Sequence, residues 1–247
     1  MPRVLRAELL RVGSGRVLAA LLLVAAFLDA VSIAGNGGRQ VDAVHAGTAT
    51  VAAASHDLLR LGFGALLFAT VHGVVLATSE FRSGSVIRSS FNAGAPERLL
   101  AAKALVALVS GAAFGVAAVA SAIAASALVL AVHGEHLVLD AESARIAAGV
   151  FAVCALAGPW GVLIGWVVRA QVSAIVGIMA WTLVAESAVV ALAPAIGRFL
   201  PGGAQASMYR DAGGDALSWP WGFVLFAGWL ALAAVAAVAL ERRRDLA

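Results

Sequence analysis

The stretch ATSEFRSGSVIRSSFNAGAPERLLAAK (Ala77–Lys103) is a polar passage between two hydrophobic segments. Charged and hydroxyl side chains follow one another closely in it, and Gly94 and Pro96 interrupt it before the chain becomes apolar again. Apolar side chains recur among the charged ones, which predicts a helix from about Ser79 to Phe91. The glycine and the proline then predict a break before the next apolar segment.

The composition of the whole chain indicates a membrane protein. Hydrophobic residues make up 62% of its 247 residues and charged residues 13%, and the mean hydropathy is +0.96. A soluble domain has about 45–50% apolar and about 25% charged residues, so this chain cannot cover a water-facing surface. We expect one all-α transmembrane domain over residues 1–247. In such a protein the sidedness of charge matters more than its sum, and no nucleic-acid partner is expected.

Six apolar segments are long enough to cross a bilayer as helices, which takes about 20 residues. They are residues 16–34, 58–78, 99–132, 145–168, 171–193 and 219–240. If both termini are cytoplasmic, most of the basic residues fall on the cytoplasmic side. These residues are Arg3, Arg6, Arg11, Arg16, Arg82, Arg88, Arg98, Lys103, Arg169 and Arg242–Arg244. The bias predicts six spans with both termini in the cytoplasm.

The N-terminus has two interpretations. A basic start followed by an apolar run is typical of a signal peptide. However, the run Val17–Ala34 is long enough to span, and the acidic Asp29 lies where cleavage would occur. The segment Val4–Val12 also has the pattern of an amphipathic helix. We therefore favour a retained first span preceded by a helix at the membrane interface.

Small residues indicate how some helices pack. Gly111 and Gly115 in the third span, and Gly161 and Gly165 in the fourth, recur at a four-residue spacing that predicts close helix contacts. Prolines and glycines between the last two spans predict a short re-entrant or interfacial helix around Ala195–Leu200.

Four polar residues in the predicted spans are candidates for a substrate path: Asp29, His72, Thr182 and Glu186. A charge inside a bilayer is costly and usually faces a cavity or a partner. The alternatives are that the acids lie near the outer interface and are hydrogen-bonded or paired with Arg39 or Arg198, and that the histidine and threonine form packing hydrogen bonds. The segment His133–His136 lacks a third ordered ligand, so no metal site is predicted.

The polar passage resembles the permeases of type-2 ABC exporters. The run Glu80–Val86 is similar to that family's E-[FYR]-x-x-G-[ST]-[IVL] signature after the second helix. Pro96, Arg98 and Lys103 match the Pro-x-Arg and the lysine that open the third helix. The N-terminal LRAELLR (Leu5–Arg11) also looks like the family's interfacial helix. The specific part of the resemblance lies in residues 77–103, whereas six spans are common to many families.

The resemblance implies a partner and a site. In that family the passage is a coupling helix that sits in a groove of a separate nucleotide-binding subunit, and ATP-driven closure of two such subunits moves two permease chains. The implied partners are ABC ATPase subunits, a second permease chain (identical or a sister chain) and the lipid bilayer. The implied coupling residues are Glu80, Phe81, Arg82, Gly84, Ser85, Ile87, Arg88 and Phe91.

The chain contains no G-x-x-x-x-G-K-[ST] motif, so ATP and Mg are expected on the partner ATPase and no cofactor directly on this chain. It is expected to be a transport subunit that exports an amphipathic or lipid-like substrate such as a drug, peptide or lipid. The alternatives are a non-catalytic membrane assembly or immunity subunit and, less favoured because its ionisable residues are isolated, a membrane-embedded enzyme. A composition rich in Ala, Gly, Val and Arg with a single Lys is typical of a GC-rich bacterial genome, so a bacterial inner membrane is the expected location.

Overall fold

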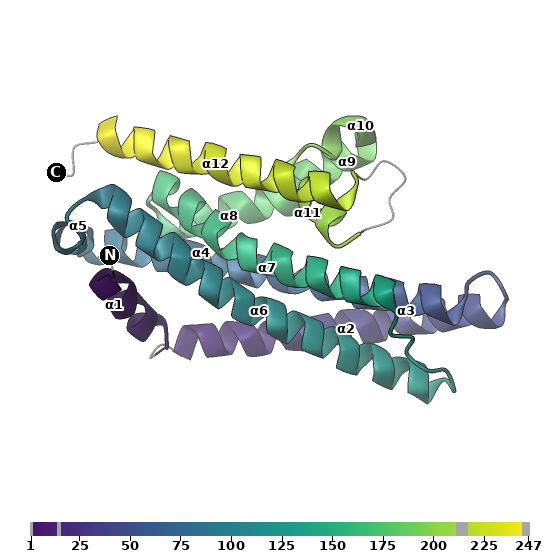
Figure 1. Ribbon diagram of the computed structural model, residues 1–247. Coiled ribbons are helices and arrows are strands. Elements are labelled where there is room, and N and C mark those ends of the chain that lie inside the picture. Colours follow the sequence, from purple (N-terminus) through teal and green to yellow (C-terminus); the bar gives the residue numbers. More distant parts are fainter. Residues whose placement is uncertain (1, 14–15, 211–216, 244–247) are drawn as a thin grey trace.

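The computed structural model describes residues 2–13, 16–210 and 217–243. This part of the chain is helical and contains no strand. Six of its helical segments are long and apolar enough to cross a membrane, and they run along the long axis of the molecule (Figure 1). The chain therefore has the architecture of a multi-pass membrane protein, as its composition predicts.

Some of the six spans are built from consecutive helices. In chain order the spans are α2 (Arg16–His45), α3 with η1 and α4 (Val51–Arg60, Leu61–Gly64 and Ala65–Ser83), α6 (Pro96–Val132), α7 (Ala141–Val168), α8 with η2 and α9 (Gln171–Ala180, Trp181–Glu186 and Ser187–Leu192) and α12 (Trp219–Arg243). The segment η1 is a 3₁₀ turn and η2 is a π-helix. The short helices outside the spans are α1 (Pro2–Gly13), α5 (Val86–Ala93), α10 (Pro194–Gly197) and α11 (Pro201–Met208).

The first two spans are longer than predicted. The helix α2 continues past Ala34, the predicted end of the first span, as far as His45. Its polar second half stays helical, and the Asn36 amide donates a hydrogen bond to the Ser32 carbonyl over 2.8 Å. The second span begins at Val51 rather than at residue 58. An apolar run marks the part of a helix that suits a bilayer, whereas the helix itself ends only where its backbone hydrogen bonds end.

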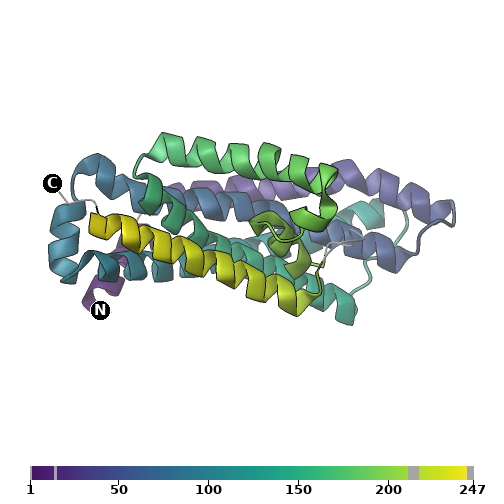
Figure 2. The same cartoon turned by 90° about the horizontal axis from the view of Figure 1, so that it is seen from above.

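The polar passage forms two helices rather than the single one predicted. The helix α4 continues to Ser83 and stops at Gly84, whose φ is +67°. The helix α5 then ends at Gly94, whose φ is +79°. Glycine adopts this left-handed backbone without the steric cost of a Cβ atom. The two turns place α5 crosswise at the end of the bundle, as Figure 2 shows.

Spans two and four form the core of the bundle. In their most apolar windows 61% of the residues are buried, against 17%, 11% and 17% in spans one, five and six. Close glycine contacts, as predicted, hold α7 against its neighbours. A Cβ atom on Gly111 of α6 would lie 2.6 Å from the Ala155 carbonyl oxygen of α7, and one on Gly165 would lie 3.1 Å from the Ala77 Cβ of α4.

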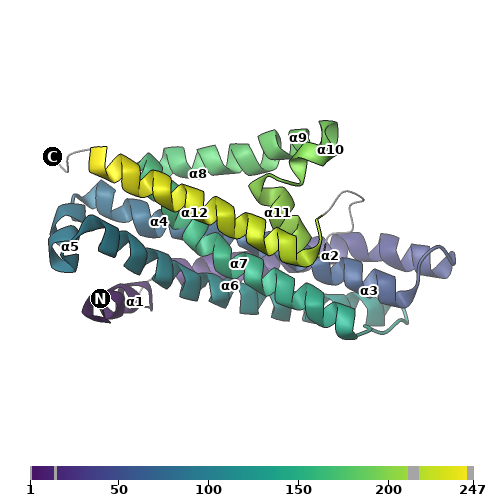
Figure 3. The ribbon, with the colours of Figure 1, turned by 45° about the horizontal axis from the view of Figure 1, so that its top comes forward.

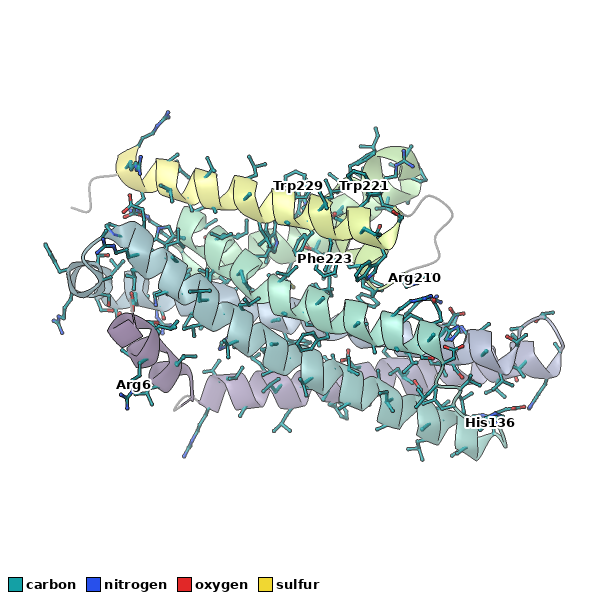
Figure 4. The ribbon with its side chains drawn as sticks, in the orientation of Figure 1. Arg6, His136, Arg210, Trp221, Phe223 and Trp229 are labelled. Atoms are coloured by element: carbon teal, nitrogen blue, oxygen red, sulfur yellow. The ribbon has the colours of Figure 1, made fainter. Side chains whose placement is uncertain are left out.

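The two ends of the bundle are different. The helices α1 and α5 and the last turn of α12 lie at one end, while α3 reaches toward the other (Figure 1). Two short helices, α10 and α11, follow span five, and α10 overlaps the predicted helix around Ala195–Leu200. The helix α11 lies between span five and α12 (Figure 3). After α11, Arg210 (labelled in Figure 4) forms an ion pair with Glu142 in the first turn of α7.

Candidate functional site

The helix α5 presents an exposed surface at the end of the bundle. The side chain of Phe91 is 82% exposed, and Arg82 and Arg88 are exposed on the same connection between spans two and three. A phenylalanine and arginines are residue types that are enriched in protein interfaces. This combination is suited to contact with a partner that offers an apolar pocket and acidic groups.

A buried ion cluster lies beneath α5. The Lys103 ammonium of α6 is 2.9 Å from the Glu8 carboxylate of α1 and 3.2 Å from the Glu80 carboxylate of α4. It also donates a hydrogen bond to the Leu76 carbonyl over 3.3 Å. The Ser89 hydroxyl of α5 donates to Glu80 over 3.2 Å. We call Glu8, Glu80, Ser89 and Lys103 the Lys103 cluster, and it joins four helices.

The buried charges of the Lys103 cluster neutralise one another, and its stability depends on this. Lys103 is 0% exposed, Glu80 1% and Glu8 7%. Removing one partner from a buried ion pair leaves an uncompensated charge, which costs about 3–5 kcal/mol. The cluster therefore fastens α5 to α1 and to the ends of spans two and three.

Phe81 links the same end of α4 to two further spans. Its ring packs edge-on against Trp166 of α7 with 5.1 Å between ring centroids, and the Arg169 guanidinium lies 5.2 Å from its centroid. Trp166 and Arg169 both donate hydrogen bonds to Glu241 of α12, over 2.9 and 2.6 Å. Glu80 and Phe81 are consecutive, so one turn of α4 connects α5 to most of the bundle.

The predicted coupling residues thus fall into two groups. Glu80 is buried, and Phe81 is half-buried against Trp166, so both make contacts within the bundle. Arg82, Arg88 and Phe91 are exposed. Gly84 and Ser85 form the turn before α5, and the side chain of Ile87 lies outside the described part of the chain.

Sequence reasoning missed the partner of Lys103. The sequence pattern marks Lys103 as a cytoplasmic basic residue and as the lysine that opens the third span, and it places Glu8 in an amphipathic helix without connecting the two. A usable signal was present, because Lys103 is the sole lysine in the chain and lies in an apolar helix. Such a charge requires a carboxylate partner inside the protein.

The four candidate path residues do not meet at one place. Thr182 and Glu186 line a small cavity with Thr70, and its volume of about 10 Å³ leaves space for about one water molecule. The Glu186 carboxylate accepts a hydrogen bond from the backbone N–H of Gly202 in α11. The buried His72 ring is 3.2 Å from the Ser110 hydroxyl, which agrees with the packing alternative for this histidine.

The fourth path residue, Asp29, lies on α2 and is 3% exposed. The ion pair with Arg39 considered for it is not formed, because the Arg39 guanidinium donates to Asn36 instead. Cys154, the one cysteine of the chain, is also buried.

Neither a protein-family model nor a curated protein sequence matches this chain. No relative therefore assigns a role to α5 or to the Lys103 cluster. A function is therefore inferred from the exposed side chains of α5 and from the buried contacts beneath it.

Proposed function

We propose that the chain is the membrane-spanning permease subunit of an ATP-driven exporter of the type-2 ABC class, and that a separate ATPase subunit binds α5. The observation that carries this proposal is the geometry of α5. A short helix lies crosswise at the end of the bundle between spans two and three (Figure 2). It presents an aromatic side chain that is 82% exposed, together with exposed arginines.

The contacts beneath α5 suit it to transmit force. A partner that pushes on α5 acts on Glu80 and Lys103 through Ser89 and the turn at Gly84. The same push acts on α7 and α12 through Phe81. Because the cluster is buried and ionic, the attached helix ends move together rather than slide past one another.

The proposed orientation places α5 in the cytoplasm, where ATP is available. The predicted charge bias supports this side, because α1, α5 and the start of α6 carry many of the basic residues. We place the protein in the inner membrane of a bacterium. Two such chains, identical or sister permeases, would work with two ATPase subunits, and the weakly buried spans one, five and six leave apolar faces for lipid or for the second permease. The substrate class we propose is amphipathic or lipid-like.

A double variant on the exposed face of α5 tests the proposal. We expect Arg88→Ala/Phe91→Ala to abolish co-purification of an ATPase with the detergent-solubilised chain from its native membrane, because it removes the exposed aromatic anchor and a charge. The co-purified protein is identified by mass spectrometry as one with a nucleotide-binding P-loop, and its ATP hydrolysis is measured. The matched control, Arg145→Ala/Phe27→Ala, removes an exposed arginine and an exposed phenylalanine elsewhere and is expected to retain the ATPase.

Two results would contradict the proposal. If no ATPase accompanies the wild-type chain, a non-catalytic membrane subunit becomes the better interpretation. If an ATPase binds the α5 variant as well as the control, the partner binds another surface.

A further inference from the structure

Asp29 lies on the inward face of α2, near the middle of that helix. The buried residues of α2 recur every four positions: Ala25, Asp29, Ile33, Gly37 and Val41. Asp29 is the acidic member of this stripe, and its neighbours along the helix, Ala25 and Ile33, are 1% and 0% exposed. The carboxyl group therefore points into the apolar core of the bundle.

The carboxyl group faces an interruption in span two. Helix α3 and helix α4 are separated by the 3₁₀ turn η1, which ends at Gly64. A Cβ atom on Gly64 would lie 2.6 Å from the Asp29 Oδ1 atom. The carboxyl thus packs directly against the backbone of the interruption, and a side chain at position 64 would require the Asp29 carboxyl to move. Interrupted spans with an acidic residue beside them are typical of ion and proton sites in membrane proteins.

Among the described residues, no cation forms an ion pair with Asp29. Its Oδ2 atom is buried and has no hydrogen-bond partner among the described residues. Arg60, just before η1, pairs with Asp57 over 2.5 Å. On α4, His72 bonds to Ser110, and α6 carries no ionisable residue between Lys103 and His133. On α7, the titratable group within electrostatic range of Asp29 is the buried thiol of Cys154.

The surroundings limit what Asp29 can bind. Hard metal ions require several oxygen ligands, and the described residues contain no group of three or more metal-binding side chains. An ionised carboxylate left alone in an apolar interior is very costly and takes up a proton instead. A proton is a ligand that needs no further space and no further donor.

We propose that Asp29 is a proton-binding site that holds its proton while α2 packs against η1 and releases it to water when these two segments separate. The proposal does not depend on what binds α5. In this arrangement the contact between spans one and two depends on the protonation of Asp29. Each time the contact opens to water, Asp29 exchanges one proton.

Infrared difference spectroscopy of the purified protein in lipid tests the proposal directly. A protonated carboxyl group shows a C=O stretching band that an ionised carboxylate lacks. In mildly acidic buffer we expect this band in the wild type, its loss in Asp29→Asn, and its retention in Glu186→Gln. The last variant is a matched control, because Glu186 is also buried in a span (4% exposed) but accepts a backbone hydrogen bond. The band should weaken in alkaline buffer.

A wild-type measurement covers the case in which Asp29→Asn does not fold. A hydrophobic carbodiimide adds to a protonated carboxyl group and leaves an N-acylurea adduct, which mass spectrometry locates. We expect the adduct at Asp29 in mildly acidic buffer and less of it in alkaline buffer. A band that persists in folded Asp29→Asn with unchanged intensity would show that the protonated carboxyl group is not Asp29 and would overturn the proposal. A carboxyl at Asp29 that does not react at any pH would also overturn it, because the proposed site opens to its surroundings when it exchanges its proton.

Discussion

The end of the bundle and its middle both bury acidic side chains, but they compensate them differently. At the end, Glu8 and Glu80 share the ammonium of Lys103 at 2.9 and 3.2 Å. In the middle, Asp29 has no cationic partner in the part of the chain that the structure describes, and it faces the backbone at Gly64. A paired charge fastens helices together, whereas an unpaired carboxyl is stable there only as a neutral acid. The first arrangement suits a rigid connection to a partner, and the second suits exchange of a proton.

The largest effect is expected from breaking the paired region. Lys103→Met leaves two buried carboxylates without a cation, so the free energy of unfolding should fall by about 3–5 kcal/mol. Chemical unfolding in detergent, followed by circular dichroism, measures this. The triple variant Lys103→Met/Glu8→Gln/Glu80→Gln is the control, because it carries no lone charge and should be more stable than Lys103→Met alone. If both variants lose the same stability, lost packing rather than uncompensated charge explains the effect.

A smaller effect is expected from the unpaired region. Gly64→Ala places a methyl group against the Asp29 carboxyl, and such overpacking should cost about 1–3 kcal/mol. The same unfolding measurement applies. Gly38→Ala, on a part of α2 where nothing lies within 4 Å of the added atom, should instead be neutral or stabilising. Adding Asp29→Ala to Gly64→Ala should recover stability; failure to recover would mean that the methyl group meets something else.

The smallest effect is expected from a third acidic residue, outside the spans. Asp140 caps α7: the Ser143 backbone N–H donates to its carboxylate, and His56 of α3 is 2.9 Å away. These hydrogen bonds lower the pKa of Asp140 to about 2, below its ordinary value of about 4. The stabilisation is therefore fully present above about pH 4 and is lost as the pH falls through about 2.

Asp140→Asn should flatten this acid dependence, which melting temperatures measured across the acid range would show. The control Glu135→Gln changes an acidic residue in the same loop and should keep the wild-type slope. Equal slopes for the wild type and Asp140→Asn would contradict the assignment.

Much of the fold could be predicted from local patterns. The six spans follow from apolar runs, and the contact of α7 with α4 and α6 follows from the spacing of Gly111, Gly115, Gly161 and Gly165. The turn at Gly84 was missed because the residues on both sides of it are compatible with one continuous helix. A single glycine in such a pattern does not reveal whether its backbone becomes left-handed.

The candidate site was predicted only in part. The passage Ala77–Lys103 was correctly singled out as the polar connection between two spans, and its exposed residues Arg88 and Phe91 were among those named. The burial of Glu80 could not be predicted from this passage, because it depends on Glu8, which is far away in the sequence but 2.9 Å from the same lysine.

A multi-span helical membrane protein could be predicted from composition and from the lengths of apolar runs, because these are properties of single segments. Which acidic residues have partners follows from the packing of the helices. Whether a buried carboxylate is paired, as Glu80 is, or unpaired, as Asp29 is, depends on distances between helices that are remote in the chain. Electrostatic energy depends on those distances and on the local polarity, and neither is encoded in the residue type.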